Sequence, residues 1–111
     1  MSYSIRITRQ ARDHLRDIKN YISEGLGAPK TARDTILLIK KAIEGLYQMP
    51  RRYKLVDEAP WHDLGVHQMR VKNYYVYYWI DEANKIVQII AVIYVSRDQM
   101  TQLDSLDLSD N

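Results

Sequence analysis

The 111-residue chain contains no cysteine and no phenylalanine, and it has only four glycines and three prolines. Without cysteine the chain can form neither a disulfide nor a thiolate metal site, a composition that is typical of a reducing cytosol. No window approaches the roughly 20 apolar residues of a membrane-spanning helix. The first residues also lack the layout of a signal peptide. We therefore expect a cytoplasmic protein without a membrane segment.

Tyrosine is the aromatic residue that the chain uses instead, with nine copies, so that most rings carry a hydroxyl group. The length fits one domain, which buries roughly 65% of the surface that the unfolded chain exposes. The net charge of +2 is a weak signal for a polyanionic partner. We predict one domain over residues 1–100, followed by an acidic polar tail over residues 101–111 that frays or forms one weak helical turn.

The stretch from Gly65 to Asp98 predicts three strands joined by two tight turns. Most residues between the turns are β-branched or aromatic, the types that fit a pleated, half-buried surface. Polar residues at 72–73 and 81–84 supply the turn chemistry. The last strand, residues 86–95, is apolar on both faces. This pattern predicts a central strand that is covered on both sides.

The first half of the chain predicts one short strand and two helices. Residues 3–7 alternate between apolar and polar, as in an amphipathic strand, and Thr8 is a candidate helix N-cap. Apolar residues then recur every three or four positions until a glycine pair that begins at Gly25. A second helix with the same spacing begins at Pro29 and ends by Pro50.

This order predicts an α+β fold. An N-terminal strand and an antiparallel two-helix hairpin pack on one face of a small, mostly antiparallel sheet of about four or five strands. The sequence does not place the first strand, and the middle of the sheet is one option. A short strand at residues 53–56 and a surface loop at residues 57–64, anchored by Trp61, precede the main strands.

Leu37, Leu38 and Tyr47 widen the apolar arc of the second helix beyond a single face. One interpretation is a broad contact with the core. The other is a partner-binding surface, because contiguous exposed apolar side chains mark sites of protein association.

Several chemistries lack their usual signals. The three histidines, His14, His62 and His67, do not have metal-ligand spacing, and no glycine-rich phosphate loop is present. No Ser-His-Asp order stands on a nucleophile-elbow sequence. The carboxylate pairs at residues 57–58 and 81–82 fall in predicted turns, where solvation explains them. We predict no metal site and no small-molecule cofactor.

The remaining signal is a basic, tyrosine-rich face of the sheet. In the strand at residues 66–72, Arg70 and Lys72 point to one face, while His67 points with its apolar neighbours toward the core. The hairpin would leave the face of Arg70 and Lys72 uncovered, and Arg97 at the end of the central strand converges on it. Such a face suits a phosphodiester backbone, with simple solvation of the charges as the alternative.

Between residues 3 and 100 the chain resembles the RelE/ParE family of bacterial toxins. No single feature is specific, and the resemblance depends on their joint order and spacing. The matching residues are Ile7, Thr8, Ala11, Leu15, Leu46, Pro50, Arg70, Val71, Asn73, Tyr74, Tyr78, Asp81, Glu82, Ile93, Tyr94, Arg97 and Asp98.

The resemblance implies the toxin half of a two-gene toxin–antitoxin system, neutralised by an antitoxin whose C-terminal segment wraps the toxin. RelE-like members cleave messenger RNA on the ribosome, whereas ParE-like members inhibit DNA gyrase and are not enzymes. The main hypothesis is a ribosome-dependent endoribonuclease with ribosome and mRNA as partners. The alternative is a gyrase inhibitor, and a third option is a non-toxic binding module.

For RNA cleavage we predict Arg97, Arg70 and Tyr94 as catalytic residues whose side chains meet on the uncovered face of the sheet. Attack of a 2′-hydroxyl on the adjacent phosphate needs a proton acceptor, a proton donor and a cation for the developing charge. Arg70 and Arg97 match two cationic positions of the RelE pattern, and Tyr94 supplies a hydroxyl group. Lys72, Arg70, Tyr75 and Lys54 are the candidate nucleic-acid-binding residues.

Three positions depart from the RelE pattern and leave its catalytic set incomplete. Gln68 stands where that pattern carries a lysine, and Tyr75 stands where it carries an arginine. Leu103 lies near the position of its catalytic tyrosine. These departures, together with the long hairpin, suit the ParE branch equally well.

Overall fold

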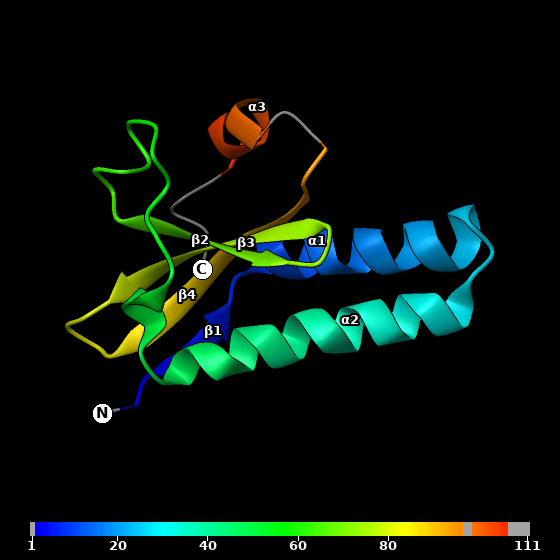
Figure 1. Ribbon diagram of the computed structural model, residues 1–111, viewed down its shortest axis with the longest axis horizontal. Helices are drawn as coiled ribbons and strands as arrows, with labels where there is room; N and C mark the ends of the chain where they lie inside the picture. Colours follow the sequence, from blue (N-terminus) through cyan, green and yellow to red (C-terminus); the bar gives the residue numbers. More distant parts are fainter. Residues whose placement is uncertain (1, 97–98, 107–111) are drawn as a thin grey trace.

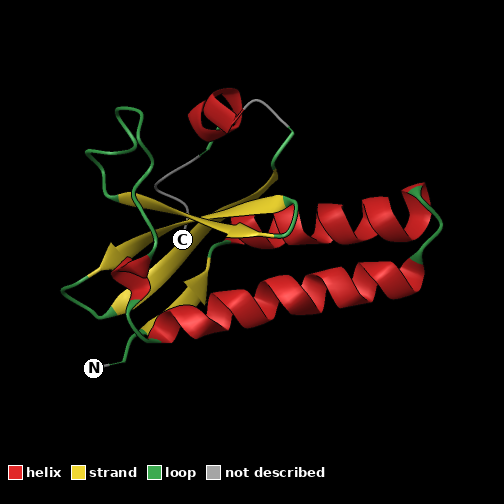
Figure 2. Cartoon of the chain, viewed as in Figure 1, coloured by secondary structure: helices red, strands yellow, loops and turns green. Residues whose placement is uncertain are grey.

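The computed structural model describes residues 2–96 and 99–106 and arranges them in three layers (Figures 1 and 2). A hairpin of two helices covers one face of a four-stranded sheet, and a short helix lies on the opposite side. The predicted α+β class and the order of strand, two helices and three strands are confirmed. No helix within the described residues is long and apolar enough to cross a membrane.

Strand β1 (Ser4–Ile7) leads directly into helix α1 (Arg9–Asn20) through the predicted cap at Thr8. The Thr8 hydroxyl accepts a hydrogen bond from the Ala11 amide at 3.3 Å and donates one to the Ile89 carbonyl at 2.8 Å. The first bond satisfies an amide of the opening helical turn, which otherwise has no partner in the helix. The second ties the start of α1 to the centre of the sheet.

The hairpin continues as the apolar spacing predicts. A single π-helical turn, η1 (Tyr21–Gly25), extends α1, and Gly27 at φ 64° reverses the chain in the left-handed region that glycine tolerates. Helix α2 (Pro29–Glu44) begins at the predicted proline. It ends earlier than predicted, and two 3₁₀ turns, η2 (Gly45–Tyr47) and η3 (Pro50–Arg52), lead to the sheet.

The sheet has the strand order β1-β4-β3-β2. Strands β2 (Val66–Val71), β3 (Tyr74–Asp81) and β4 (Ile86–Tyr94) pair antiparallel, and β1 pairs parallel with β4. The prediction that the last strand is central is therefore confirmed. The first strand lies at the edge of the sheet and not in its middle.

The segment that precedes β2 forms only part of a fifth strand. Leu55 makes an isolated antiparallel bridge with His67, and the Gln68 amide donates to the Lys54 carbonyl at 3.0 Å. The following loop is anchored by Trp61, which is 6% exposed, as the sequence indicated. This segment shields the beginning of the edge strand β2 from pairing with another chain.

One hydrophobic core lies on each side of the sheet. The larger core joins the hairpin to one face, and the smaller core joins the other face to the loop before β2 and to helix α3 (Gln99–Asp104). The larger contains Ala11, Leu15, Ile39, Ile43, Leu46, Met69, Val71, Val76, Tyr78, Ile80, Val87, Ile89 and Val92. The smaller contains Val56, Trp61, Val66, Tyr77, Ile90, Ala91, Ile93 and Leu103.

For the part of residues 101–111 that the structure describes, helix α3 agrees with the predicted helical turn and not with a frayed tail. Leu103 is 0% exposed and Leu106 packs against the smaller core. Burying a leucine side chain contributes about 1.5–3 kcal/mol, which favours a docked helix over a solvated segment. Residues 107–111 lie outside the described part of the chain.

Candidate functional site on the sheet face opposite the hairpin

The sheet face opposite the hairpin carries two of the four residues, Arg70 and Tyr75, that the sequence assigned to nucleic acid. Strand β2 presents Gln68 and Arg70 on this face, and β3 presents Tyr75, Tyr77 and Trp79, because side chains alternate along a strand. The register pairs Gln68 with Tyr77 and Arg70 with Tyr75. Directly opposed residues of an antiparallel pair share a face, so these side chains are neighbours.

The centre of this face is covered, which corrects the expectation of a bare sheet. Leu103 of α3 and Trp61 of the loop before β2 pack there with Ala91 and Ile93 of β4. The physical reason lies in the composition of β4, whose apolar residues point to both faces. The second apolar face gains free energy when it is removed from water, and α3 and the loop remove it.

A chain of three uncharged side chains fixes α3 to the sheet. The Gln68 amide nitrogen donates to the Tyr77 hydroxyl at 3.0 Å, and that hydroxyl donates to the Gln99 Oε1 at 2.8 Å. The Gln99 Nε2 donates to the Tyr94 carbonyl at 2.8 Å. Burial raises the pKa of Tyr77 to about 12, although the bond from Gln68 lowers it in part. The Tyr77 phenol is therefore protonated at neutral pH and unsuited to accept a proton.

Arg70 lies at the rim of this face, beside Tyr75. Its guanidinium carbon is 5.8 Å from the centroid of the Tyr75 ring, and its Nε donates to the Lys72 carbonyl at 2.9 Å. The side chain is exposed. Lys72 corrects the expectation, because β2 ends at Val71 and Lys72 stands in the turn at φ 52°. Strand alternation therefore does not direct its side chain to the face of Arg70.

Tyr94 lies on the opposite face, which contradicts its predicted convergence with Arg70. Its register partner is Tyr74, and the two rings meet edge to face with centroids 5.5 Å apart. Tyr74 packs against the core beneath the hairpin. The cause is a β-bulge at Ile90, the extra residue between the partners of Tyr77 and Tyr78. A bulge shifts the alternation of the following residues by one position and so moves Tyr94 to the hairpin side.

Two further predicted site residues have different outcomes. Arg97 lies outside the described residues, so its proposed role stays a prediction. Lys54 is exposed on the segment beside β2, where its ammonium group pairs with the Asp57 carboxylate at 3.0 Å. The Lys54 carbonyl accepts the Gln68 amide, so Lys54 lies beside Gln68 and two positions along β2 from Arg70.

The apolar residues assigned to a partner remain accessible on the hairpin. Leu37 is 62% exposed, Leu38 39% and Tyr47 45%. Leu37 and Leu38 point about 100° apart around the helix axis, so they do not form one flat patch. Tyr21 and Leu26, which the apolar pattern of the second helix does not include, are 64% and 60% exposed near the free end of the hairpin. Their role as partner contacts stays a prediction.

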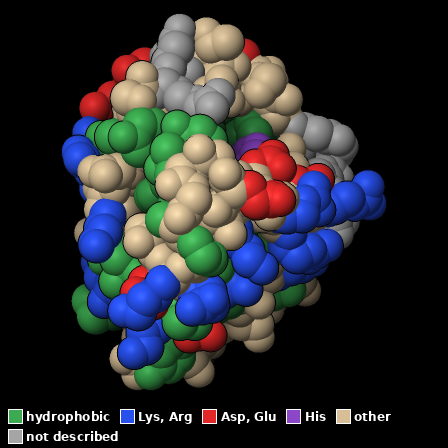
Figure 3. Space-filling model, turned by 90° about the vertical axis from the view of Figure 1, so that its right-hand side faces the viewer, with side chains coloured by type: hydrophobic (Ala, Val, Ile, Leu, Met, Phe, Trp, Pro, Cys, Tyr) green, Lys and Arg blue, Asp and Glu red, His purple; other side chains and the backbone are tan. Residues whose placement is uncertain are grey.

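The outer surface of the hairpin is basic. Figure 3 shows Lys and Arg side chains gathered over the end of the molecule that the two helices form. One of these cations, Arg16, pairs with Asp13 at 3.2 Å. The exposed cations are Arg9, Arg12, Arg16 and Lys19 on α1, and Lys30, Arg33, Lys40 and Lys41 on α2. This surface attracts anionic partners by its charge.

The described part of the chain offers no site for a metal ion. No group of three or more His, Asp or Glu side chains there is arranged to hold an ion.

Comparison with known proteins identifies a family. A family model described as the ParE toxin of the type II toxin–antitoxin system parDE matches residues 5–99. No curated protein matches the chain.

Solved structures share the fold at low sequence identity. A chromosomal ParDE system from P. aeruginosa aligns with a TM-score of 0.72 and 20% identity, over 86% of this chain and 98% of that one. The RelBE2 toxin–antitoxin complex from Mycobacterium tuberculosis aligns with a TM-score of 0.60 and 22% identity, over 85% and 99%. A free mutant of the E. coli toxin RelE aligns with a TM-score of 0.61 and 13% identity, over 92% and 93%.

Proposed function

The chain belongs to the ParE toxin family of type II toxin–antitoxin systems, and we propose that it arrests growth by binding DNA gyrase without cutting RNA. The observation that carries this proposal is the covered, uncharged centre of the sheet face opposite the hairpin. The RNA-cleaving pattern needs a lysine, an arginine and a tyrosine at positions where this chain has Gln68, Tyr75 and Leu103.

None of the three side chains that fix α3 to this face suits the role of proton acceptor in RNA cleavage. Gln68 and Gln99 do not titrate, and the Tyr77 phenol has a pKa of about 12. An efficient general base has a pKa near the working pH. Tyr94, the predicted acid–base residue, is on the other side of the sheet from Arg70. These placements favour a toxin that works by binding.

The packing of α3 on the sheet gives a steric reason against RNA binding at this face. A strand of RNA on this face would have to displace α3, whose Leu103 is fully buried and whose Gln99 makes two hydrogen bonds. A binder of gyrase does not need the centre of the sheet. Its contacts can lie on the basic hairpin and its exposed apolar residues, which stay accessible.

Ribosome-dependent mRNA cleavage is the second candidate function. Arg70 remains exposed beside Tyr75 at the rim, where a guanidinium and a ring could meet a phosphate and a base. Because Arg70 and Tyr75 lie away from α3, RNA could reach them without displacing that helix.

We further propose that a cognate antitoxin neutralises the toxin in the cytoplasm by covering the exposed apolar residues of the hairpin. Leu37, Leu38 and Tyr47 are the predicted contacts, and all are at least 39% exposed. An amphipathic helix or an extended segment would bury them and complement the surrounding basic charge. The ParDE and RelBE2 systems that share this fold support a two-protein arrangement.

Two parallel assays test the target. Purified toxin is added to DNA gyrase during supercoiling of relaxed plasmid, and to a reconstituted translation reaction in which transcripts are mapped by primer extension. We expect dose-dependent inhibition of supercoiling and intact transcripts. Cleavage at codon boundaries with unaffected supercoiling would overturn the proposal in favour of RNA cleavage.

An arginine variant sharpens the comparison. The gyrase hypothesis predicts that Arg70→Ala leaves supercoiling inhibition unchanged, whereas the RNA hypothesis predicts a loss of transcript cleavage because a charge at the phosphate is removed. Arg52→Ala is the matched control, an exposed arginine at the end of η3. The same pair of substitutions can be compared for growth arrest in cells.

A further inference from the structure

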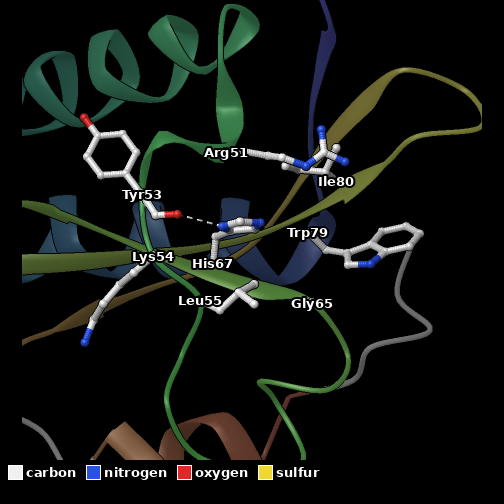
Figure 4. A pocket seen from close by; sticks show the side chains of 8 residues that line it. All are labelled: Arg51, Tyr53, Lys54, Leu55, Gly65, His67, Trp79 and Ile80. Carbon is white, nitrogen blue, oxygen red and sulfur yellow. Dashed lines mark hydrogen bonds between the residues drawn. The ribbon is translucent and has the colours of Figure 1, made fainter.

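A surface groove lies at the end of the sheet remote from Arg70 and has no part in the function proposed above. It has a volume of about 470 Å³, within the range of small-ligand sites. It lies between the segment that precedes β2, the start of β2 and the end of β3 (Figure 4). The lining residues are Arg51, Tyr53, Lys54, Leu55, Gly65, His67, Trp79 and Ile80.

His67 is held in one orientation on the floor of this groove. Its ring stacks on Tyr78, with centroids 5.0 Å apart and planes inclined by 10°. Its Nδ1 lies 2.8 Å from the Tyr53 carbonyl oxygen. A carbonyl only accepts hydrogen bonds, so Nδ1 carries the proton, and in the neutral ring Nε2 keeps a free lone pair. Figure 4 shows Nε2 on the side of the ring that faces away from Tyr53, toward the open groove.

Trp79 leaves β3 on the opposite face from His67, but both residues line the groove at the edge of the sheet where β2 begins, and Trp79 supplies an accessible aromatic surface there (Figure 4). Its indole is 40% exposed, whereas Trp61 is 6% exposed. Gly65 stands against it at φ 81°, and a Cβ at that position would lie 3.5 Å from the indole Cδ1. A larger side chain there would cover part of the indole, so glycine both permits the turn and leaves the ring open.

Two cations stand at the rim, and each has a carboxylate partner. Arg51 pairs with Glu82 and donates to the Tyr3 hydroxyl at 3.4 Å, and Lys54 pairs with Asp57. Arg51, Lys54 and Asp57 are largely exposed and Glu82 is partly exposed, and ion pairs of this kind are weak. The groove therefore has little net charge. Its distinctive groups are the indole and the imidazole lone pair.

We propose that this groove binds the base of a nucleotide. The base stacks on Trp79, an amino group on the base donates a hydrogen bond to the His67 Nε2, and the sugar-phosphate lies toward the exposed rim. Stacking suits any base because every base has a π-face, while the lone pair of Nε2 selects bases that carry a donor. The source is either a free nucleotide or an unpaired nucleotide within a strand.

Tryptophan fluorescence of the full-length chain provides a direct test. Titration with AMP should quench the exposed Trp79 and leave the buried Trp61 as an internal reference. We expect saturation with a Kd on the order of 1 mM, which suits one stacked base and one hydrogen bond. Purine riboside 5′-monophosphate, which keeps the sugar-phosphate of AMP and lacks only the amino group, should bind roughly 3- to 10-fold more weakly. No saturable quenching up to about 10 mM AMP would overturn the proposal.

Substitutions in the groove test whether AMP binds there. Because Trp79 is itself replaced, binding is measured by NMR of the ligand and not by tryptophan fluorescence. Trp79→Leu should weaken AMP binding by roughly 5-fold or more. His67→Phe keeps a ring on Tyr78 and should remove the preference for AMP over purine riboside 5′-monophosphate. Tyr21→Leu, which removes an exposed ring near the free end of the hairpin, is the matched control and should bind normally. Equal binding by Trp79→Leu, with its fold verified by circular dichroism, would refute the assignment.

The two possible sources of the ligand, a free nucleotide and an unpaired nucleotide in a strand, are distinguished by comparing the binding of AMP, of a short single-stranded oligo-dA and of the same oligo-dA paired with oligo-dT. Tighter binding of the single strand than of AMP identifies an unpaired nucleotide as the ligand, and equal binding per base identifies the free nucleotide. Binding of the duplex alone would refute the proposal, because paired bases do not offer a free face. Each result is independent of gyrase inhibition, so failure here leaves the proposed function standing.

Discussion

Replacement of Leu103 by alanine tests whether α3 closes the sheet face opposite the hairpin. Leu103 is 0% exposed and packs with the smaller core, which includes Tyr77 and Ile93. The substitution removes buried apolar atoms without adding a polar group or a charge. Leu64→Ala provides a matched control, because Leu64 is 48% exposed in the loop before β2.

The expected loss depends on whether α3 stays docked. If the surroundings hold their shape, a buried leucine-to-alanine change costs about 2–5 kcal/mol in the free energy of unfolding. A short terminal helix can also undock, and then the loss cannot exceed the free energy that docking contributes. We expect about 2 kcal/mol for Leu103→Ala, at the low end of the range, and less than about 0.5 kcal/mol for Leu64→Ala.

Urea denaturation followed by circular dichroism measures the global loss, and amide hydrogen exchange of α3 and β4 measures local opening. Leu103→Ala should increase exchange of the amides of α3 and β4 while the hairpin stays protected. A loss no larger than that of Leu64→Ala would mean that α3 is undocked much of the time. The sheet face would then be available to RNA, and the main support for a binding toxin would be removed.

Substitutions at three further positions test single contacts. Tyr77→Phe should cost about 1–3 kcal/mol in urea melts, because it leaves the amides of Gln68 and Gln99 without their shared hydroxyl. Thr8→Ala should cost about 1–2 kcal/mol, and Thr8→Ser should restore most of it by keeping the cap oxygen. Burial lowers the pKa of His14 below its ordinary value of 6.5, so stability should fall as pH drops from about 6.5 through the folded-state pKa. His14→Gln should flatten that dependence in melts between pH 5 and pH 7.5, and an unchanged slope would contradict the assignment.

The direction of the His14 effect follows from its bond to the sheet. The Val92 amide donates to the His14 Nδ1 at 3.2 Å, which requires that this nitrogen carry no proton. Burial favours the neutral ring, while Asp17 and Asp13 oppose the shift by favouring the charged form. The unfolded chain therefore binds a proton more readily than the folded chain does, and acid favours unfolding.

The fold was predictable because its signals are local and mutually consistent. Thr8 has the chemistry of a cap and lies between an alternating strand and a helical spacing, so both boundaries follow from it. The apolar residues on both faces of β4 indicated a central strand with cover on each side. That same observation also implied a cover for the second face, yet the basic residues of β2 suggested that this face was bare.

The bulge at Ile90 could not be predicted from the sequence, and it determines the site. Nothing in a run of Ile, Ala and Val marks one residue as extra, because each fits a strand equally well. Its effect is nonetheless large, since a shift of one position moves every following side chain to the other face. Tyr94 was assigned to the wrong face for this reason alone.

The sequence contained a signal for helix α3, but the polar composition of the segment outweighed it. Leu103 and Leu106 are three residues apart, which suits one face of a helical turn. The surrounding acidic and polar residues indicated a solvated tail. Tertiary burial in the smaller core decided the outcome, as it does for most short helices, which are marginal in isolation.

The choice between the two targets lies in side chains and not in the backbone, because toxins named for both branches share this fold. In this chain Gln68, Tyr77 and Gln99 form an uncharged chain beneath α3. A lysine at position 68 would place an ammonium beside a protonated phenol without an anionic partner, and burying such a charge is costly. Under the proposed function, conversion to a ribonuclease therefore requires at least two changes together, a cation at this position and removal of the α3 cover. Either change alone should leave transcripts intact, so the missing cation and the covered face would both be barriers to RNA chemistry.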